Sequence, residues 1–307
     1  MKILLFGKNG QVGEALQRSE KLHDLIALDR TTANFENLDY LKRIIEETCP
    51  DFIINAAAYT NVDKAASEAE KAYLINAKAV GVLAETAKVV GATLIHYSTD
   101  YVFDGTKEGS YLEDDQPCPI NVYGKSKLAG EEEIISSGCD YLIFRTSWVY
   151  SAHGHNFIKT IMRLAQEKNS LQIVSDQIGV PTSANLIADI TAVIIQHIKE
   201  NNVKKEDING IYNLAPSGKT NWYEIAHFIV GEMQGAHLPL NLSLNSITPT
   251  VSENYPTPAK RPKNSQLDTK KITSTFNVDL PNWADHARQT VAELIKKISI
   301  VGEENDK

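Results

Sequence analysis

Residues 3–13 read Ile3-Leu4-Leu5-Phe6-Gly7-Lys8-Asn9-Gly10-Gln11-Val12-Gly13. The apolar run at the start is typical of a strand that a parallel sheet buries on both faces. Gly7, Gly10 and Gly13 follow, and glycine lets a backbone turn tightly and approach a pyrophosphate without an obstructing Cβ. Glycines placed between a strand and a helix predict a dinucleotide-binding loop. The alternative is three turn glycines in an unrelated α/β protein.

The same alternation of strand and helix continues along the first half of the chain. Apolar residues at helical spacing predict helices over residues 38–45 and 68–89. Between the helices, further short apolar runs predict buried strands at Leu25–Leu28, Phe52–Ile54, Thr93–Ile95 and Tyr141–Phe144. This order is typical of an α/β fold with a doubly wound parallel sheet, the Rossmann type, with right-handed crossovers. Residues 1–150 are therefore predicted to form a dinucleotide-binding domain.

The pattern loosens after residue 150. We expect residues 151–307 to form mainly a smaller α/β substrate-binding domain, with a helix over about 183–199 that returns to the first domain. Other predicted elements are helices over residues 157–164 and 283–298 and strands at residues 171–174 and 211–214. Residues 239–262 are polar, contain prolines and lack periodicity, which is typical of a long functional loop.

Composition excludes several kinds of protein. The 307 residues include 42% hydrophobic and 23% charged residues, as in an ordinary globular protein. A formal net charge of -8 disfavours nucleic acid and anionic membranes as partners. Cys49, Cys118 and Cys139 have no metal-ligand spacing, and no apolar run approaches the roughly 18 residues of a membrane span. We therefore expect a soluble cytoplasmic protein.

Two charged residues follow the second predicted strand. Asp29 is placed to bind the ribose hydroxyls of NADH, whereas Arg30 is placed to pair with the 2′-phosphate of NADPH. Because both are present, the sequence leaves the preference between NADH and NADPH open. Ordinary solvent-exposed charges at a strand end are the alternative for either residue.

Tyr123 and Lys127 are four residues apart, a spacing that puts both on one face of a helix. A phenol with a pKa near 10 is a poor acid or base at neutral pH unless a nearby cation stabilises its phenolate, which Lys127 can do. A packed tyrosine beside a surface lysine is the alternative. Thr99 ends a predicted strand at the carboxyl edge of the sheet, where such folds bind ligands, and is placed to bond a substrate oxygen.

These residues together resemble the extended short-chain dehydrogenase/reductase superfamily, which also accounts for residues 55–58 (Asn-Ala-Ala-Ala) and Asn76. The resemblance narrows to the dTDP-4-dehydrorhamnose reductase family and covers nearly the whole chain. The stretches that carry it, in order, are residues 7–13, 55–65, 99–105, 145–150, 179–182 and 261–268. Six ordered stretches are more specific than any one of them.

The resemblance implies an NAD(P)H-dependent oxidoreductase that reduces the 4-keto group of dTDP-4-dehydro-L-rhamnose to dTDP-L-rhamnose for surface polysaccharides such as O-antigen. Tyr123 would protonate the new alkoxide, Lys127 would tune Tyr123 and bind the cofactor ribose, and Thr99 would hold the oxygen. The implied cofactor contacts are Gly10, Gln11, Val12, Ala56, Ala57 and Ala58, and the implied sugar contacts are Asp100 and Trp148. Within the basic cluster of Lys260, Arg261 and Lys263, the family pattern favours Arg261 as a substrate contact, against a solvated basic loop.

The family resemblance fails at one feature. Some members hold Mg²⁺ at a dimer contact with carboxylates, but here Glu14 stands one place early, Ala15 fills the expected position, and Asn185 stands near the second. A neutral amide is a poorer ligand for Mg²⁺ than a carboxylate. We therefore predict no structural metal, and a monomer or weak homodimer.

Two other functions compete with this interpretation. Nucleotide-sugar dehydratases and epimerases resemble the chain, but dehydratases usually carry Asp-Glu after the threonine, whereas Asp100 is followed by Tyr101. The regulatory β subunit of methionine adenosyltransferase is also similar and serves mainly as a binding partner. Intact Thr99 and Trp148 favour an enzyme.

Overall fold

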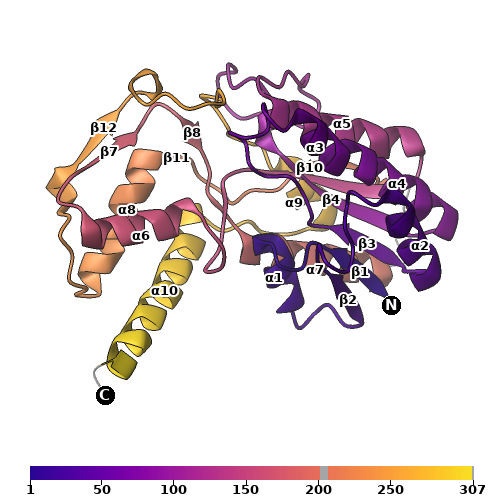
Figure 1. Ribbon diagram of the computed structural model, residues 1–307, viewed down its shortest axis with the longest axis horizontal. Coiled ribbons are helices and arrows are strands. Elements are labelled where there is room, and N and C mark those ends of the chain that lie inside the picture. Colours follow the sequence, from indigo (N-terminus) through magenta and orange to yellow (C-terminus); the bar gives the residue numbers. More distant parts are fainter. Residues whose placement is uncertain (201–206, 306–307) are drawn as a thin grey trace.

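A six-stranded, wholly parallel sheet forms one lobe of the computed structural model, which describes residues 1–200 and 207–305 (Figure 1). Its order from edge to edge is β2-β1-β3-β4-β5-β10. The strands are β1 (Ile3–Phe6), β2 (Leu25–Leu28), β3 (Phe52–Asn55), β4 (Thr93–Thr99), β5 (Asp140–Thr146) and β10 (Gly210–Asn213). The strand order changes direction between β1 and β3, so the crevice for a ligand opens beyond the carboxyl ends of these two strands.

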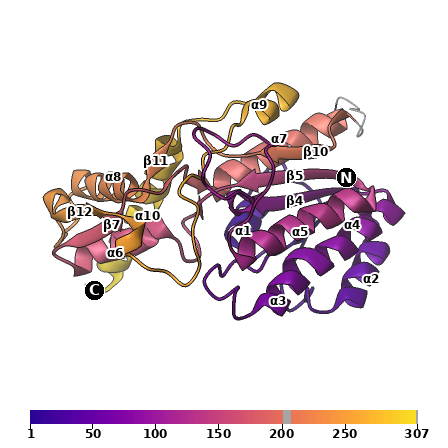
Figure 2. The ribbon, with the colours of Figure 1, turned by 90° about the horizontal axis from the view of Figure 1, so that it is seen from above.

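Helices cover both faces of this sheet, which confirms the doubly wound fold predicted from the sequence. Alternate residues of β1 point into different layers: Ile3 and Leu5 pack with one set of helices, and Leu4 and Phe6 with the other. Figure 2 shows α7 on one side of β4 and β5, and α4 and α5 on the opposite side. The first layer contains α1 (Gln11–Gln17), α7 (Ala184–Glu200) and α9 (Lys270–Phe276), and the second contains α2 (Leu38–Thr48), α4 (Ala79–Val90) and α5 (Val122–Ser137).

The helix predicted over residues 68–89 is interrupted. It consists of α3 (Ala69–Tyr73), a π-helical turn η1 (Leu74–Lys78) and α4. Asn76 lies in the wide turn, where its side chain bonds both the backbone N–H and the carbonyl of Tyr59 at 2.8 and 3.0 Å and donates to Ser126 Oγ at 3.0 Å. Single π-helical turns of this kind occur mostly at functional sites. Here the turn connects the loop after β3 to helix α5.

The second lobe has a separate apolar core, formed around three helices. They are α6 (Phe157–Glu167), α8 (Trp222–Gly235) and α10 (Trp283–Asn305). Short strand pairs complete it: β6 (Val149–Tyr150) with β9 (Thr182–Ser183), β8 (Ile178–Gly179) with β11 (Thr220–Asn221), and β7 (Leu171–Val174) with β12 (Ile247–Thr250). Because α7 and β10 join the first lobe, residues after 150 contribute to both lobes, and the domain boundary at residue 150 stays a prediction.

The prediction of an irregular loop over residues 239–262 was wrong in part. The segment contains β12, which pairs in parallel with β7, and two single 3₁₀ turns, η4 (Leu244–Ser246) and η5 (Ser252–Asn254). This strand is four residues long and contains Pro249, so its own pattern is weak and its pairing partner determines its conformation. In the part of the chain that the structure describes, no helix is long and apolar enough to cross a membrane.

Close contact at Gly130 determines how α5 lies against η1. A Cβ built at Gly130 would come within 2.1 Å of the carbonyl oxygen of Asn76. We expect Gly130→Ala to lower the free energy of unfolding by roughly 2 kcal/mol, because overpacking outweighs the better helix propensity of alanine. Urea unfolding measures this change. Gly231→Ala in α8 is the matched control, since a Cβ there meets nothing within 4 Å; it should gain up to about 1 kcal/mol. Equal effects of the two changes would contradict the packing argument.

Candidate active site

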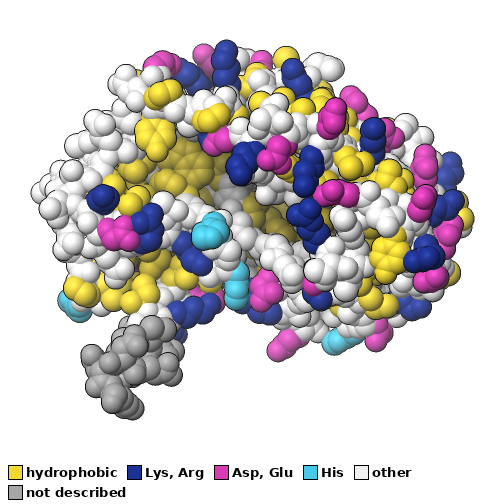
Figure 3. Space-filling view, in the orientation of Figure 1, with side chains coloured by type: hydrophobic (Ala, Val, Ile, Leu, Met, Phe, Trp, Pro, Cys, Tyr) yellow, Lys and Arg dark blue, Asp and Glu magenta, His cyan; other side chains and the backbone are white. Residues whose placement is uncertain are grey.

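A cavity of about 970 Å³ lies between the two lobes, at the carboxyl edge of the sheet. Figure 3 shows the hollow there, with hydrophobic side chains on its walls. The first lobe contributes the loops after β1, β2, β3 and β4, and the second contributes Trp148 and Trp222 among others. Its volume is at the upper end of the range for ligand pockets. The cavity therefore has room for a large ligand or for two ligands together.

The glycine loop forms one end of the cavity. Gly7 has a φ of +85°, and a Cβ there would lie 2.6 Å from the backbone nitrogen of Ala57, so only glycine fits. Gly10, Gln11 and Val12 line the cavity as predicted. Gly13 is not among the lining residues; a Cβ there would come within 2.1 Å of the Gly7 carbonyl. Gly13 thus lets α1 pack against the loop.

Gln11 connects this loop to the second lobe. Its amide nitrogen donates to the carbonyl of Val149 at 3.3 Å. Its amide oxygen accepts from Asn156 at 2.9 Å and from Ser151 at 3.4 Å. The loop that would hold a cofactor is therefore in direct contact with the chain that follows β5.

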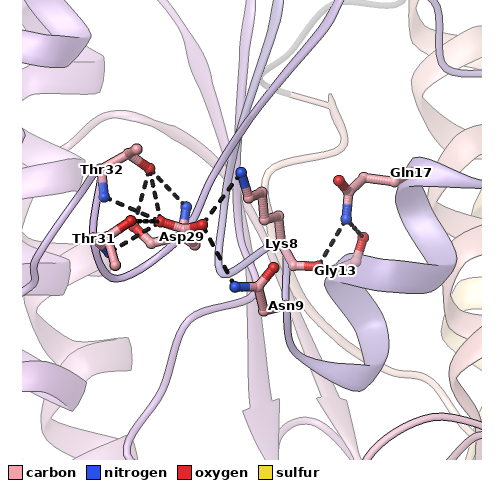
Figure 4. A network of polar contacts seen from close by, with 7 residues as sticks. All are labelled: Lys8, Asn9, Gly13, Gln17, Asp29, Thr31 and Thr32. Carbon is pink, nitrogen blue, oxygen red and sulfur yellow. Dashed lines mark hydrogen bonds and ion pairs between the residues drawn. The ribbon is translucent and has the colours of Figure 1, made fainter.

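Asp29 is enclosed by hydrogen-bond donors (Figure 4). One of its oxygens accepts from the N–H and hydroxyl of Thr31, at 2.9 and 2.6 Å, and from the N–H of Thr32. The other lies 3.2 Å from Lys8 Nζ. These bonds, that from the Thr31 side chain first, hold the pKa of Asp29 well below its usual value. Its oxygens are therefore engaged in the turn after β2.

Arg30, next in the chain, is mostly exposed and donates to Glu36 at 2.8 Å, which also pairs with Lys71 at 3.2 Å. Asp29, Arg30 and Lys71 all line the cavity. An acid for a ribose diol and two cations for a phosphate thus lie at the same end of it. The geometry leaves both NADH and NADPH as candidates.

Three alanines line the cavity directly after β3, at Ala56, Ala57 and Ala58. The amide of Asn55 determines their path, because its Oδ1 accepts the N–H of Ala57 at 3.1 Å. Small side chains here leave the backbone accessible to a bound molecule. All three predicted contacts therefore lie where the cofactor was expected.

Tyr123, Thr99 and Asp100 all line the cavity. Tyr123 is in the first turn of α5. The N-cap of this helix is Asn121, whose side chain accepts from the Gly124 N–H at 2.8 Å. Burial raises the pKa of Tyr123 to about 12, a hydrogen bond with Thr99 opposes this shift, and the charge of Asp100 adds to it. The phenol thus keeps its proton at neutral pH, as a proton donor must.

Asp100 is 3% exposed, and only one of its oxygens is bonded. Oδ1 accepts the hydroxyl of Thr99 at 3.0 Å, whereas Oδ2 has no partner. Burial raises the pKa of this carboxyl to about 6, and hydrogen bonding by the hydroxyls of Ser265 and Thr99 opposes the shift. An unsatisfied buried oxygen in a cavity wall is a ready acceptor for a hydroxyl group of a ligand.

Lys127 is buried, one helical turn beyond Tyr123. Its Nζ lies 2.7 Å from the carbonyl of Tyr97 and 3.0 Å from Nε2 of His96. Burial lowers the pKa of Lys127 to about 8, against the opposing charge of Glu131. The sequence interpretation missed His96, although a histidine inside the apolar strand Leu94-Ile95-His96 was a visible signal.

An aromatic pair forms the wall on the side of the second lobe. Trp148 stacks on Trp222 with ring centroids 3.9 Å apart, and Trp222 Nε1 donates to Gln177 at 3.1 Å. Trp148 has a φ of 47°, and its ring fits only because residue 179 is glycine, where a Cβ would lie 2.6 Å away. Trp148 lies in the cavity wall as predicted; Trp222, which no motif singled out, lies beside it.

Arg261, predicted as a substrate contact, does not line the cavity. Its guanidinium donates to Asp63 at 2.8 Å and to the carbonyl of Ala259 at 3.2 Å. In the same basic cluster, the carbonyl of Lys260 is held by Asn121, and Lys263 pairs with Glu253 at 2.8 Å. Asp63 and Asn121 of the first lobe thus hold this segment in place. A substrate contact at Arg261 stays a prediction.

The residues considered as metal ligands make other contacts instead. Glu14 is 4.0 Å from His153, and the N–H of Asn185 donates to Ser183. Within residues 1–200 and 207–305, no three His, Cys, Asp or Glu side chains are grouped so as to hold a metal ion. A metal-free protein remains an expectation.

Comparison with known proteins gives a consistent picture. Residues 1–296 match the family model described as the RmlD substrate binding domain. The dTDP-4-dehydrorhamnose reductase of Escherichia coli K12 is 45% identical over 98% of this chain and 100% of its own length. A crystal structure of the Bacillus anthracis dTDP-4-dehydrorhamnose reductase in complex with NADP is 33% identical, with a TM-score of 0.83 over 95% of this chain and 100% of that one. A crystal structure of a Clostridium acetobutylicum dTDP-4-dehydrorhamnose reductase has a TM-score of 0.86 at 33% identity. The match covers 96% of this chain and 99% of that one.

The raised pKa of Asp100 predicts a pH-dependent stability. The folded protein binds this proton more tightly than the unfolded chain, so the stabilisation is full below pH about 4 and is lost as the pH rises through about 6. We expect Asp100→Asn, which cannot ionise, to be more stable relative to the parent at pH 8 than at pH 4 by about 3 kcal/mol. Urea unfolding at both pH values measures the difference. A difference that does not change with pH would contradict the burial of a charged carboxylate.

Proposed function

The chain belongs to the RmlD substrate binding domain family, and from that premise we propose that it reduces the 4-keto group of dTDP-4-dehydro-L-rhamnose to give dTDP-L-rhamnose. The observation that carries the proposal is the meeting of Tyr123, Thr99 and Lys127 in the same cavity as the glycine loop. The protein is an NAD(P)H-dependent oxidoreductase, and its product serves in the synthesis of surface polysaccharide.

The residues of the cavity fit a nicotinamide dinucleotide. Gly7 and Gly10 leave space that a Cβ would fill, next to the backbone of Ala56, where a pyrophosphate can approach. Asp29 and Arg30 lie at the end suited to the adenosine ribose. The buried Lys127 would hold the nicotinamide ribose. When bound, the reduced nicotinamide supplies the hydride.

The chain's own residues would perform the rest of the reaction. Thr99 holds the carbonyl oxygen by a hydrogen bond, and Tyr123 gives its proton to that oxygen as it becomes an alkoxide. Lys127, as an ammonium, stabilises the tyrosinate that remains. Asp100 would accept a hydroxyl of the sugar with its unbonded oxygen, and the ring of Trp148 would lie against the sugar.

A dehydratase would need a further acid next to Asp100. Tyr101 stands there instead, and its ring packs edge-on against Tyr123 at 5.6 Å. Tyr101 thus supplies no carboxyl beside Asp100, and burial raises the pKa of its phenol above the usual value. The arrangement therefore supports simple reduction, and the presence of Thr99 and Trp148 in the cavity wall supports an enzyme over a purely regulatory subunit.

We further propose a cytoplasmic location, a monomer or weak homodimer, and no nucleic-acid or membrane partner. Cys49, Cys118 and Cys139 are all free thiols, which suits a reducing compartment. The net charge of -8 means that the anionic substrate must be held by local cations.

The assay for this function follows absorbance at 340 nm with the purified protein, NADPH or NADH, and dTDP-4-dehydro-L-rhamnose. We expect Tyr123→Phe to lower kcat by roughly 100- to 10,000-fold, because the proton donor is removed, while binding of NADPH is retained. Fluorescence titration with NADPH measures the binding.

Tyr73→Phe is the control, because Tyr73 is at the exposed end of α3 and does not line the cavity. It should leave both kcat and binding unchanged. Near-normal turnover in Tyr123→Phe would show that another group donates the proton. Absence of cofactor oxidation by the parent protein with this substrate would contradict the proposed reaction.

A further inference from the structure

His96 is a buried titratable group to which the proposed reaction gives no role. It lies in the middle of β4, is 0% exposed, and has one polar neighbour at each ring nitrogen. Nδ1 is 3.0 Å from Nδ2 of Asn55, and Nε2 is 3.0 Å from Nζ of Lys127. The three side chains form a row from β3 through β4 to α5, and the row ends at the cavity.

The position of each proton in this row follows from the hydrogen-bond partners. Oδ1 of Asn55 accepts the backbone N–H of Ala57, so the amide cannot be turned around without setting two N–H groups against each other. The NH₂ group of Asn55 therefore donates to Nδ1 of His96, which must carry a lone pair. A neutral imidazole then has its proton on Nε2, facing Lys127.

This proton determines the form of the lysine. An ammonium at Nζ would direct N–H groups toward the Nε2–H of His96, and neither group could accept. A neutral amine accepts the Nε2–H with its lone pair and still donates to the carbonyl of Tyr97 at 2.7 Å. Of the possible assignments, this one leaves no donor facing another donor. A charged His96 is excluded because burial holds its pKa well below the usual value.

We propose that His96 is a positioning residue that favours the neutral amine of Lys127 in the cofactor-free protein at mildly alkaline pH, so that NAD(P)H binding there is accompanied by proton uptake at Lys127. The proton uptake on cofactor binding rests on the proposed function, in which Lys127 acts as an ammonium. The proton comes from solvent and forms a new N–H bond at Nζ. No electron transfer is involved.

The surrounding charges are compatible with a neutral amine. Glu131, on α5 itself, favours the ammonium, but its carboxylate is shared with Arg145 from β5, at 2.6 and 3.0 Å, and with the hydroxyl of Ser98 from β4. The other ionisable groups near by are Tyr123 on α5 and Asp100 on η2 (Asp100–Val102). Burial lowers the pKa of Lys127 to about 8, in the direction that the hydrogen bonds require.

The test is a calorimetric titration of the whole protein with NADH in two buffers of different ionisation enthalpy, which gives the number of protons taken up. We expect the uptake to increase from pH 7 to pH 9 and to approach about one proton. Lys127→Met should abolish it. His96→Leu should shift the pH at which uptake begins upward by about one unit, because the donor that favours the amine is lost.

Two further variants control the result. Thr191→Val removes the bond between Thr191 and the hydroxyl of Tyr97, 2.9 Å long, but keeps every side chain of the row from Asn55 to Lys127; it should leave proton uptake unchanged. Asn55→Asp places an acceptor at Nδ1, moves the ring proton there and leaves Nε2 free to accept from an ammonium. This variant should shift the pH at which uptake begins upward, as His96→Leu does. If His96→Leu does not fold, Asn55→Asp is tested in its place.

The Lys127 Cε chemical shift, followed by NMR against pH in the cofactor-free protein, is an independent readout. A midpoint near 8 in the parent and a higher one in His96→Leu would support the proposal. An unchanged midpoint in folded His96→Leu, or no proton uptake by a parent protein that reduces the keto-sugar, would overturn it. A parent protein that takes up the proton but reduces no keto-sugar would instead contradict the proposed function.

Discussion

The buried ion pair between Glu131 and Arg145 is the interaction on which the site depends. Both side chains are 2% exposed or less, and they join the middle of α5 to the end of β5 at 2.6 Å. Removing one partner from such a pair typically costs about 3–5 kcal/mol, because the other charge stays buried without compensation. Ile134 is the fully buried apolar residue of this helix, and the other buried side chains on it include Ser126, Lys127 and Glu131. The helix that carries Tyr123 and Lys127 is therefore positioned mostly by polar groups.

This mode of packing has a direct chemical result. An apolar helix face would place no donors or acceptors at the sheet, whereas α5 brings the amino group of Lys127 against the backbone of β4. Gly130 and Ser126 let the helix approach the π-helical turn closely enough for Asn76 to reach across. Burial of this polar layer then raises the pKa of Tyr123 and lowers that of Lys127. Fold and acid-base chemistry thus have the same physical cause.

The sequence predicted the fold well where a local pattern determines structure. Buried strands such as Ile3–Phe6 are continuous apolar runs, and glycines at fixed places indicated the cofactor loop. The π-helical turn at residues 74–78 and the strand at residues 247–250 could not be predicted, because partners distant in the chain determine both. The domain boundary is blurred for the same reason, since β10 joins β5 across a long separation.

The site, like the fold, could be predicted where a local motif determines it and not where contacts between distant residues do. Motif residues such as Thr99 and Tyr123 meet in one cavity, as their positions at the sheet edge required. His96 and Trp222 carry no motif, and their importance comes from what they touch in the fold. For Arg261 the motif pointed to a substrate contact, but in the fold its guanidinium donates to Asp63.

The indole of Trp148 limits which residues can form the cavity wall on the side of the second lobe. Its backbone is left-handed, and its ring lies so close to Gly179 that any side chain at position 179 would displace it. The ring in turn covers one face of Trp222. These three positions can therefore change only as a set, and a relative with a differently shaped sugar pocket would have to exchange all of them at once.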